Sequence, residues 1–400
     1  MISLFIFLLC LVLSHPGQDQ TNILPRPSGE HSVGVCYLYF TDESRKELFD
    51  NSGQSSREIT VKAWYPTDKK SNPQPYLLNA EFAIKYCMFP EIFRDLKTNS
   101  GRDLPVSSVE KKYPVLVFSH GWGEHFSQNS ILMEELASHG YIIFSIAHHY
   151  ESRYSEYPDG RIIHIDFNSL RFQKIWKEQQ NPKAMELLLK QYNARNDEER
   201  IQIFLEISNL LPTTLKESPK HWAEDISFTI DQLKDINSEN NILKNKLDLD
   251  KIGVFGMSMG AIASSEICLT DKRIKAGISI EGGLHGSLLT DMKLQQPFLF
   301  LNGKKFLGYG ELFTGKSFTD CYSMSVKNAD HYNFTDYSIY PYPLAKSLMG
   351  TIDGNRIIEI TNVIIRAFFD KYLKENKEID LIVEAKKYPE IEAVTNIDQN

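Results

Sequence analysis

The chain has 400 residues, of which 42% are hydrophobic and 24% are charged, as is typical of a globular protein with a buried core. Its formal net charge of -8 and sequence pI of about 5.8 argue against nucleic acid as a partner, because nucleic-acid-binding domains carry basic surfaces. The length allows one large domain or two ordinary ones.

Residues 1–14 are almost wholly apolar, and a polar stretch follows them from His15 onwards. The run is too short to span a bilayer, so we interpret residues 1–17 as a secretory signal peptide. A buried helix or a membrane anchor is the alternative, and the lack of a positively charged start counts against a signal peptide. The mature protein is therefore expected to be secreted, into the extracellular space or a periplasm.

The cysteines that remain once residues 1–17 are removed are compatible with disulfides in an exported protein, but their spacing reveals no disulfide framework. They are Cys36, Cys87, Cys268 and Cys321. Cys268 lies in a segment expected to form a helix, and we expect it to be a buried free thiol.

The N-terminal part of the chain is predicted to contain a pair of strands followed by a strand-loop-helix-strand unit. Alternating polarity predicts the pair, and a continuous apolar run ending in Gly121-Trp122-Gly123 predicts the first strand of the unit. Such a unit is typical of a parallel sheet. The expected ranges are 33–40 and 57–65 for the pair, then 113–120, 126–139 and 141–147 for the unit.

From Glu151 to about Asn240 the sequence changes to charged, amphipathic helices without glycine turns. We predict a helical insertion between about residues 170 and 220, with helices over 184–192 and 198–211. This insertion could cap the site as a lid or be a solvated decoration. A helix over 222–233 is expected to pack on the sheet.

The segment from Lys251 to Ala263 contains the motif on which the functional interpretation depends. Residues 252–255 predict a short buried strand, Gly256-Met257-Ser258-Met259-Gly260 matches G-x-S-x-G, and a helix is expected to begin directly afterwards. In α/β-hydrolases this pattern is a sharp strand-to-helix turn that exposes a strained nucleophilic serine. The motif alone occurs by chance in on the order of one chain in ten. A catalytic interpretation therefore also requires an acid and a histidine further along the chain.

The remaining elements complete an α/β-hydrolase domain over residues 33–375, with a mostly parallel central sheet flanked by helices. Strands are predicted over 276–280, 297–301 and 322–326, and an amphipathic helix over 356–373. Residues 376–400 are expected to be a polar, peripheral C-terminal tail.

The expected partners of Ser258 are Glu281 as the acid and His331 as the base, because α/β-hydrolases place serine, acid and histidine in this order. Glu281 follows a predicted strand and precedes two glycines, and His331 follows the last predicted strand of the domain. A carboxylate at the carboxyl end of a strand points into the crevice where such sheets bind ligands. Asp330 is the rival acid, although an adjacent residue rarely reaches its neighbour's Nδ1.

Two backbone N–H groups are expected to hold the oxyanion. Met259 N–H follows the nucleophile, and Trp122 N–H lies in the glycine turn after an earlier strand. The Trp122 indole is expected either to wall the acyl pocket or to belong to the core. We assign His120 to the oxyanion loop, and His148 with His149 to the end of the next strand.

With these residues assembled, the chain resembles the secreted platelet-activating-factor acetylhydrolases, also called lipoprotein-associated phospholipases, and their bacterial dienelactone-hydrolase-like relatives. The resemblance covers most of residues 33–375, and the combination of its motifs is specific although no single one is. The motifs are AWYP (63–66), YPVLVFSHGWG (113–123), LASHGY (136–141), GMSMG (256–260), PFLFLN (297–302) and DHYNFTD (330–336).

The resemblance implies Ser258 as nucleophile, His331 as base and Glu281 at the acid position, with no metal or other cofactor. This chain departs from the family in having Glu281 where Asp is usual and Met257 where His is common. Glutamate is an accepted triad acid, but its extra methylene requires a different placement of the histidine loop. The sequon at Asn333 matches a structural position of the family, so we expect it to be unglycosylated.

The function implied is hydrolysis of the short or oxidised sn-2 acyl ester of platelet-activating-factor-like phospholipids through an acyl-enzyme. The alternatives are a general short-chain carboxylesterase, a dienelactone- or polyester-hydrolase-like enzyme, and a catalytically inactive hydrolase used for binding. The expected partner is a phospholipid or small ester. The hydrophobic loop over 305–315 is expected to contact a lipid surface or to belong to the core.

Overall fold

The protein is described by a computed structural model that covers residues 23–157, 159–191, 193–239, 241–283, 293–303, 314, 317–340 and 345–396. The expected signal peptide and most of the 305–315 loop lie outside these residues. Within the described ranges, no helix is long and apolar enough to cross a membrane.

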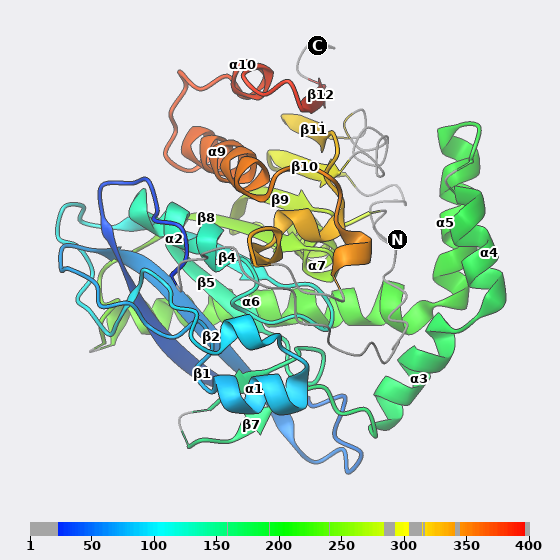
Figure 1. Ribbon diagram of the computed structural model, residues 1–400, viewed down its shortest axis with the longest axis horizontal. Coiled ribbons are helices and arrows are strands. Elements are labelled where there is room, and N and C mark those ends of the chain that lie inside the picture. The colour runs from blue at the N-terminus through cyan, green and yellow to red at the C-terminus, as the bar shows by residue number, and fades with distance from the viewer. Residues whose placement is uncertain are drawn as a thin grey trace.

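A twisted sheet of ten strands forms the centre of the molecule, in the order β12-β11-β10-β9-β8-β4-β5-β2-β1-β3 (Figure 1). Its strands are β1 (Ser32–Lys46), β2 (Ser56–Thr67), β3 (Gly101–Arg102), β4 (Tyr113–Ser119), β5 (Ile142–Ala147), β8 (Leu247–Met257), β9 (Ile274–Ile280), β10 (Phe298–Gly303), β11 (Cys321–Val326) and β12 (Ile391–Thr395). A separate two-stranded sheet joins β6 (Ser155–Glu156) and β7 (Ile162–Ile163).

Strands β5, β4, β8, β9, β10 and β11 run parallel, so their carboxyl ends meet at one edge of the sheet. The predicted pairing of the first two strands is confirmed, since β1 and β2 are antiparallel and β2 also pairs antiparallel with β5. The mostly parallel, helix-flanked sheet expected from the sequence is therefore present.

Helices cover both faces of the sheet and shorter helical turns connect the strands. The helices are α1 (Ala80–Cys87), α2 (Ser130–Ser138), α3 (Leu170–Gln179), α4 (Pro182–Gln191), α5 (Asp197–Leu210), α6 (Ser218–Ser238), α7 (Met259–Thr270), α9 (Gly354–Tyr372) and α10 (Leu381–Lys386). The turns are the π-helical η2 (Thr213–Glu217) and the 3-10 segments η1 (Glu91–Phe93), η5 (His331–Phe334), η6 (Asp336–Ser338) and η7 (Lys346–Leu348).

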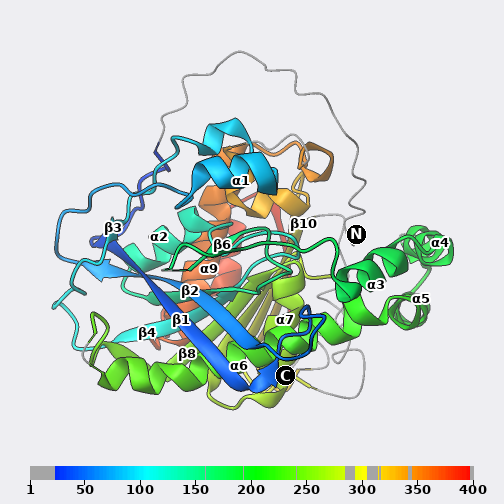
Figure 2. The same cartoon turned by 90° about the horizontal axis from the view of Figure 1, so that it is seen from below.

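Two hydrophobic clusters fix the helices on the sheet. The apolar sides of α6 and α7 pack on one face, where Trp222, Ile226 and Ile267 are buried, and α2 and α9 pack on the other face through residues such as Leu136 and Phe369. The helix predicted over 222–233 thus packs on the sheet as expected, although α6 is longer. The predicted insertion forms α3, α4 and α5, and Figures 1 and 2 show α4 and α5 projecting from the body.

The C-terminal segment differs from the expected peripheral tail. Helix α10 buries Leu381 and Ala385, and β12 pairs antiparallel with β11 to form the last strand of the sheet. The strand is only five residues long and includes the charged Glu392, so its hydrophobic pattern is too weak to predict it from sequence. The strand is stabilised by its antiparallel backbone pairing with β11.

The cysteines Cys36, Cys87, Cys268 and Cys321 are buried free thiols. The expectation for Cys268 is thereby confirmed, and no disulfide joins these residues.

Candidate active site

Ser258 occupies a strained turn between β8 and α7. Its φ is 56° and its ψ is -113°, a conformation that a residue with a Cβ rarely adopts. A Cβ on Gly256 would lie 2.3 Å from backbone atoms of Gly260, and a Cβ on Gly260 would lie 2.1 Å from the Ser119 carbonyl oxygen. Both glycines of the G-x-S-x-G motif are therefore required by close packing, and the half-buried serine is held where they meet.

Glu281 and His331 lie next to each other beside this turn. Glu281 directly follows β9 and His331 begins η5, after β11. His331 Nδ1 lies 3.2 Å from Glu281 Oε2, and both side chains are buried. The Gly303 N–H donates to Glu281 Oε1, and Glu281 N–H donates to the Leu301 carbonyl, so β10 holds the carboxylate in place. A carboxylate at Nδ1 orients a histidine so that its Nε2 can accept a serine proton.

The rival acid, Asp330, has a different role. Its Oδ1 accepts the His331 backbone N–H at 2.9 Å and so caps η5. Asn333 Oδ1 accepts the N–H groups of Asp330 and Gly350, and Asn333 is buried. This capping box orients the histidine loop, and the burial of Asn333 leaves no space for a glycan at its sequon.

The two expected oxyanion donors are brought to the nucleophile by separate elements. Met259 is the first residue of α7, so its N–H belongs to the helix end that has no intrahelical acceptor. Trp122 follows Gly121, and a Cβ built on Gly121 would lie 3.5 Å from Ser258 Cβ. The His120 carbonyl accepts the Gly260 N–H at 3.1 Å and thereby joins the two elements.

A pocket partly open to solvent lies beside the Trp122 turn. Its wall is mostly aromatic: the Trp122 ring stacks with Phe172 at 6.1 Å between centroids, and Phe172 stacks with Trp176 at 6.4 Å. Phe172 and Trp176 belong to α3, so this helix of the insertion forms part of the wall. Met88, at the end of α1, lines the cavity too, and Arg153 beside it pairs with Glu124.

The Trp122 side chain is held in place by a hydrogen bond to Glu151. Its indole N–H donates to Glu151 Oε1 at 3.3 Å, and the same carboxylate accepts the Trp222 indole N–H at 2.7 Å through Oε2. Gly123 N–H donates to the Glu151 carbonyl at 2.9 Å. The indole thus contributes to the cavity wall while its polar edge is hydrogen-bonded to the core.

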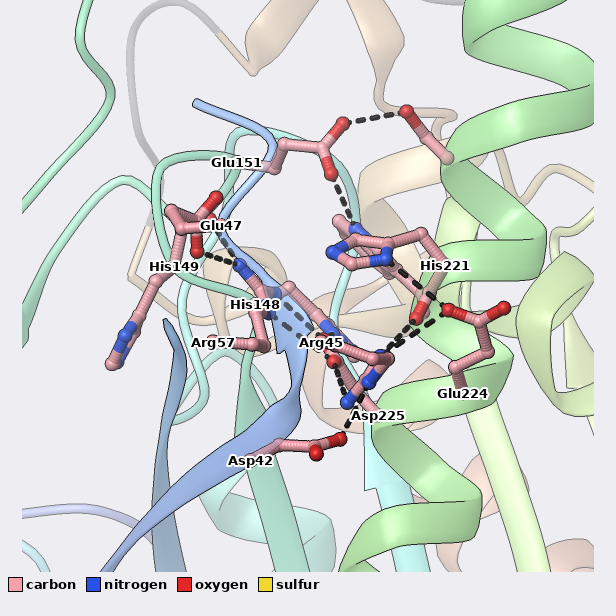
Figure 3. A network of polar contacts seen from close by, with 12 residues as sticks. Asp42, Arg45, Glu47, Arg57, His148, His149, Glu151, His221, Glu224 and Asp225 are labelled. Carbon is pink, nitrogen blue, oxygen red and sulfur yellow. Dashed lines mark hydrogen bonds and ion pairs between the residues drawn. The ribbon is translucent and has the colours of Figure 1, made fainter. Parts of the chain in front are cut away.

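A buried polar network behind the oxyanion turn was not predicted from the sequence; Figure 3 shows it in part. Its centre is His148, which contacts Ser119 and Asp225. These residues come from β4, the loop after β5 and α6, and no local pattern connects them. The signal available in the sequence was the number of polar residues, such as Arg57 and Asp225, in segments predicted to face the core.

Comparisons with known proteins relate the chain to one family. The family model described as platelet-activating factor acetylhydrolase, isoform II, matches residues 17–388. The platelet-activating factor acetylhydrolase of Bos taurus is 25% identical over 381 residues, covering 89% of this chain and 79% of the relative. The corresponding protein of Gallus gallus is 26% identical over 382 residues, covering 91% and 87%.

A solved structure shares the fold. The ferulic acid esterase from Streptomyces cinnamoneus superposes with a TM-score of 0.67 at 20% sequence identity, and the match covers 93% of this chain and 99% of that chain. At this identity the likeness supports the architecture alone.

Proposed function

The chain belongs to the family of platelet-activating factor acetylhydrolases, isoform II, and on this basis we propose that it hydrolyses the short-chain sn-2 acyl ester of platelet-activating-factor-like or oxidised phospholipids. Two contacts support the proposal: His331 Nδ1 lies 3.2 Å from Glu281 Oε2, and the Ser258 N–H donates to the carbonyl of Ile280, the residue before Glu281, at 2.9 Å. A strained serine, a histidine and a carboxylate in this chain order are the groups that acyl transfer requires.

In the proposed mechanism, His331 Nε2 accepts the proton of Ser258 Oγ as the oxygen attacks the ester carbonyl. The tetrahedral oxyanion accepts hydrogen bonds from Trp122 N–H and Met259 N–H. Collapse of the intermediate breaks the ester bond, and His331 returns the proton to the departing lysophospholipid alcohol. His331 then deprotonates a water that attacks the acyl-enzyme, which releases the carboxylic acid and regenerates Ser258. Glu281 stabilises the imidazolium in both halves of the reaction.

The aromatic cavity is assigned to an apolar group of the substrate. Because the cavity adjoins the turn that carries Trp122 N–H, a substrate bound through its carbonyl oxygen would place a substituent near the indole. We also propose that the protein is secreted after removal of residues 1–17. Contact of the 305–315 loop with a lipid surface stays a prediction, because that loop lies almost wholly outside the described residues.

The test compares kcat/KM for phosphatidylcholines with sn-2 acetyl, sn-2 butyroyl and sn-2 long-chain acyl groups, with Ser258→Ala as the blank. We expect a strong preference for the short chains and a loss of several orders of magnitude in kcat in the blank. Poor turnover of all three lipids beside rapid cleavage of a soluble butyrate ester would instead identify a general short-chain carboxylesterase. Wild-type activity in Ser258→Ala would refute the nucleophile assignment.

A further inference from the structure

The buried network behind the oxyanion turn has the atom order of a hydrolase triad, and Figure 3 shows two of its members, His148 and Asp225. Ser119 Oγ lies 3.0 Å from His148 Nε2, and His148 Nδ1 lies 2.8 Å from Asp225 Oδ2. All three residues are 0% exposed, so no substrate can reach this serine. The arrangement must therefore serve the structure around it.

Asp225 is held in its ionised form by the charges around it. The Arg57 guanidinium donates to both carboxylate oxygens, at 2.6 and 3.2 Å, and Arg45 Nη2 lies 3.0 Å from Oδ1. Burial alone would raise the pKa of Asp225, but Arg57 and His148 hold that pKa well below its ordinary value. An ionised Asp225 only accepts, so His148 carries a proton on Nδ1. Burial lowers the pKa of His148, which keeps its ring neutral, so Nε2 accepts a hydrogen bond from the Ser119 hydroxyl.

The position of His148 decides the tautomer of a second histidine, His120. The His148 backbone N–H donates to His120 Nε2 at 3.3 Å, so this nitrogen carries no proton. Burial and the nearby His148 lower the pKa of His120 well below its ordinary value, which keeps its ring neutral. The single ring proton therefore resides on His120 Nδ1, which lies 2.7 Å from the Gly121 carbonyl oxygen and donates to it.

The Gly121 carbonyl belongs to the peptide group that carries the Trp122 N–H. It accepts the His120 Nδ1–H and also the Glu124 backbone N–H at 3.0 Å. In a planar trans peptide the carbonyl and the N–H point in opposite directions, and the structure contains no cis bond among the described residues. Fixing the carbonyl on one side thus fixes the direction of Trp122 N–H on the other.

We propose that His120 is a positioning residue of the oxyanion hole, whose Nδ1–H holds the Gly121 carbonyl so that Trp122 N–H faces the tetrahedral intermediate. His148, anchored by Asp225 and stacked on Trp222 at 3.9 Å between ring centroids, sets the tautomer that this contact needs. The inference rests on the proposed serine-esterase function. The proposed contacts form a polar chain from Arg57 in β2 through Asp225, His148 and His120 to the peptide group that carries Trp122 N–H.

Two substitutions at His120 test separately its Nδ1 donor to the Gly121 carbonyl and its Nε2 acceptor for the His148 N–H. In His120→Asn the amide nitrogen replaces Nδ1 and can still donate to Gly121, whereas in His120→Gln the amide lies near the position of Nε2 and this donor is lost. We expect His120→Gln to lower kcat about 10- to 100-fold, since losing an oxyanion donor outright costs about 10²–10³-fold. Its affinity for a trifluoromethyl ketone, which binds as a tetrahedral adduct, should fall in parallel while KM is unchanged. His120→Asn should stay within about threefold of wild type in kcat.

Equal losses in both variants, or a change in KM alone, would overturn the proposal, and thermal unfolding of each variant controls for lost fold. A measurement on the wild type avoids that risk: ¹⁵N NMR of histidine-labelled protein should show His120 protonated on Nδ1. Protonation on Nε2 would contradict the proposal even if no variant folds. If the wild type cleaves no ester, the proposed function fails, whereas the NMR result still reports whether the contact to Gly121 exists.

Discussion

At the scale of single residues, the backbone accommodates a glutamate at the expected acid position. Glu281 adopts a positive φ of 51°, and a Cβ on Gly303 would lie 3.0 Å from its Oε1. The strained backbone and the missing side chain at Gly303 make room for the extra methylene. The carboxylate consequently reaches His331 Nδ1 at 3.2 Å.

We predict that Glu281→Gln lowers kcat by about 10³–10⁴-fold, because an amide nitrogen facing Nδ1 favours the wrong histidine tautomer. Asp330→Asn is the matched control, since an asparagine keeps the capping acceptor for His331 N–H and removes only the charge. Steady-state kinetics on a soluble ester would measure both. A large loss in Asp330→Asn with little change in Glu281→Gln would transfer the acid role to Asp330.

The candidate catalytic residues could be proposed from sequence because each follows a strand in a known order and Ser258 lies in a local motif. His148 and Asp225 could not be paired in this way, because they are 77 positions apart and belong to different elements. The role of His120 depends on which ring nitrogen carries its proton, and this is visible only once its neighbours are placed.

At the scale of elements, helix α3 adds to the cavity a wall that the central sheet and its flanking helices do not provide. The helices predicted over 184–192 and 198–211, expected to be a lid or a solvated decoration, project outwards as α4 and α5 (Figure 2). Helix α3 brings Phe172 and Trp176 to the cavity. The amphipathic pattern predicted that helices exist in the insertion. It could not predict which of them faces the site, because that depends on the path of the connecting loops.

We predict that Trp176→Ala lowers kcat/KM for the preferred phospholipid about 10-fold, because it removes aromatic surface that would cover an apolar group. The kcat/KM for a small acetate ester should stay unchanged, as that substrate does not fill the cavity. Lys177→Ala, at an exposed position of the same helix, is the control. Equal losses on both substrates would show that α3 supports the fold and not the specificity.

At the scale of the whole molecule, the parallel order of the central strands and the helices on both faces followed from the alternation of apolar strands with helical segments. The edge strand β12 did not, because its pairing with β11 is made by the backbone and leaves little trace in residue type. The buried cysteines Cys36, Cys87, Cys268 and Cys321 form no disulfide with one another.

We predict that these thiols react only when the molecule unfolds. Burial raises the pKa of Cys87 to about 11 and those of Cys36 and Cys321 to about 12, and it also raises the pKa of Cys268. Since the thiolate is the reactive form, labelling at pH 8 should be at least ~100-fold slower in native protein than in urea. The experiment uses chain without residues 1–17, which removes Cys10. Rapid native labelling would contradict the packing around the labelled cysteine.

The most direct test of the central claim, that Ser258 is the nucleophile of an acyl-transferring enzyme, is covalent labelling with a fluorophosphonate followed by mass spectrometry. Trypsin should release residues 252–272, a peptide that also contains Ser264 and Ser265 as internal controls. We predict one adduct on Ser258, absent from Ser258→Ala and formed far more slowly in Glu281→Gln. The absence of any adduct would contradict this claim and favour a hydrolase fold used for binding, whereas an adduct on another serine would refute Ser258 as the nucleophile.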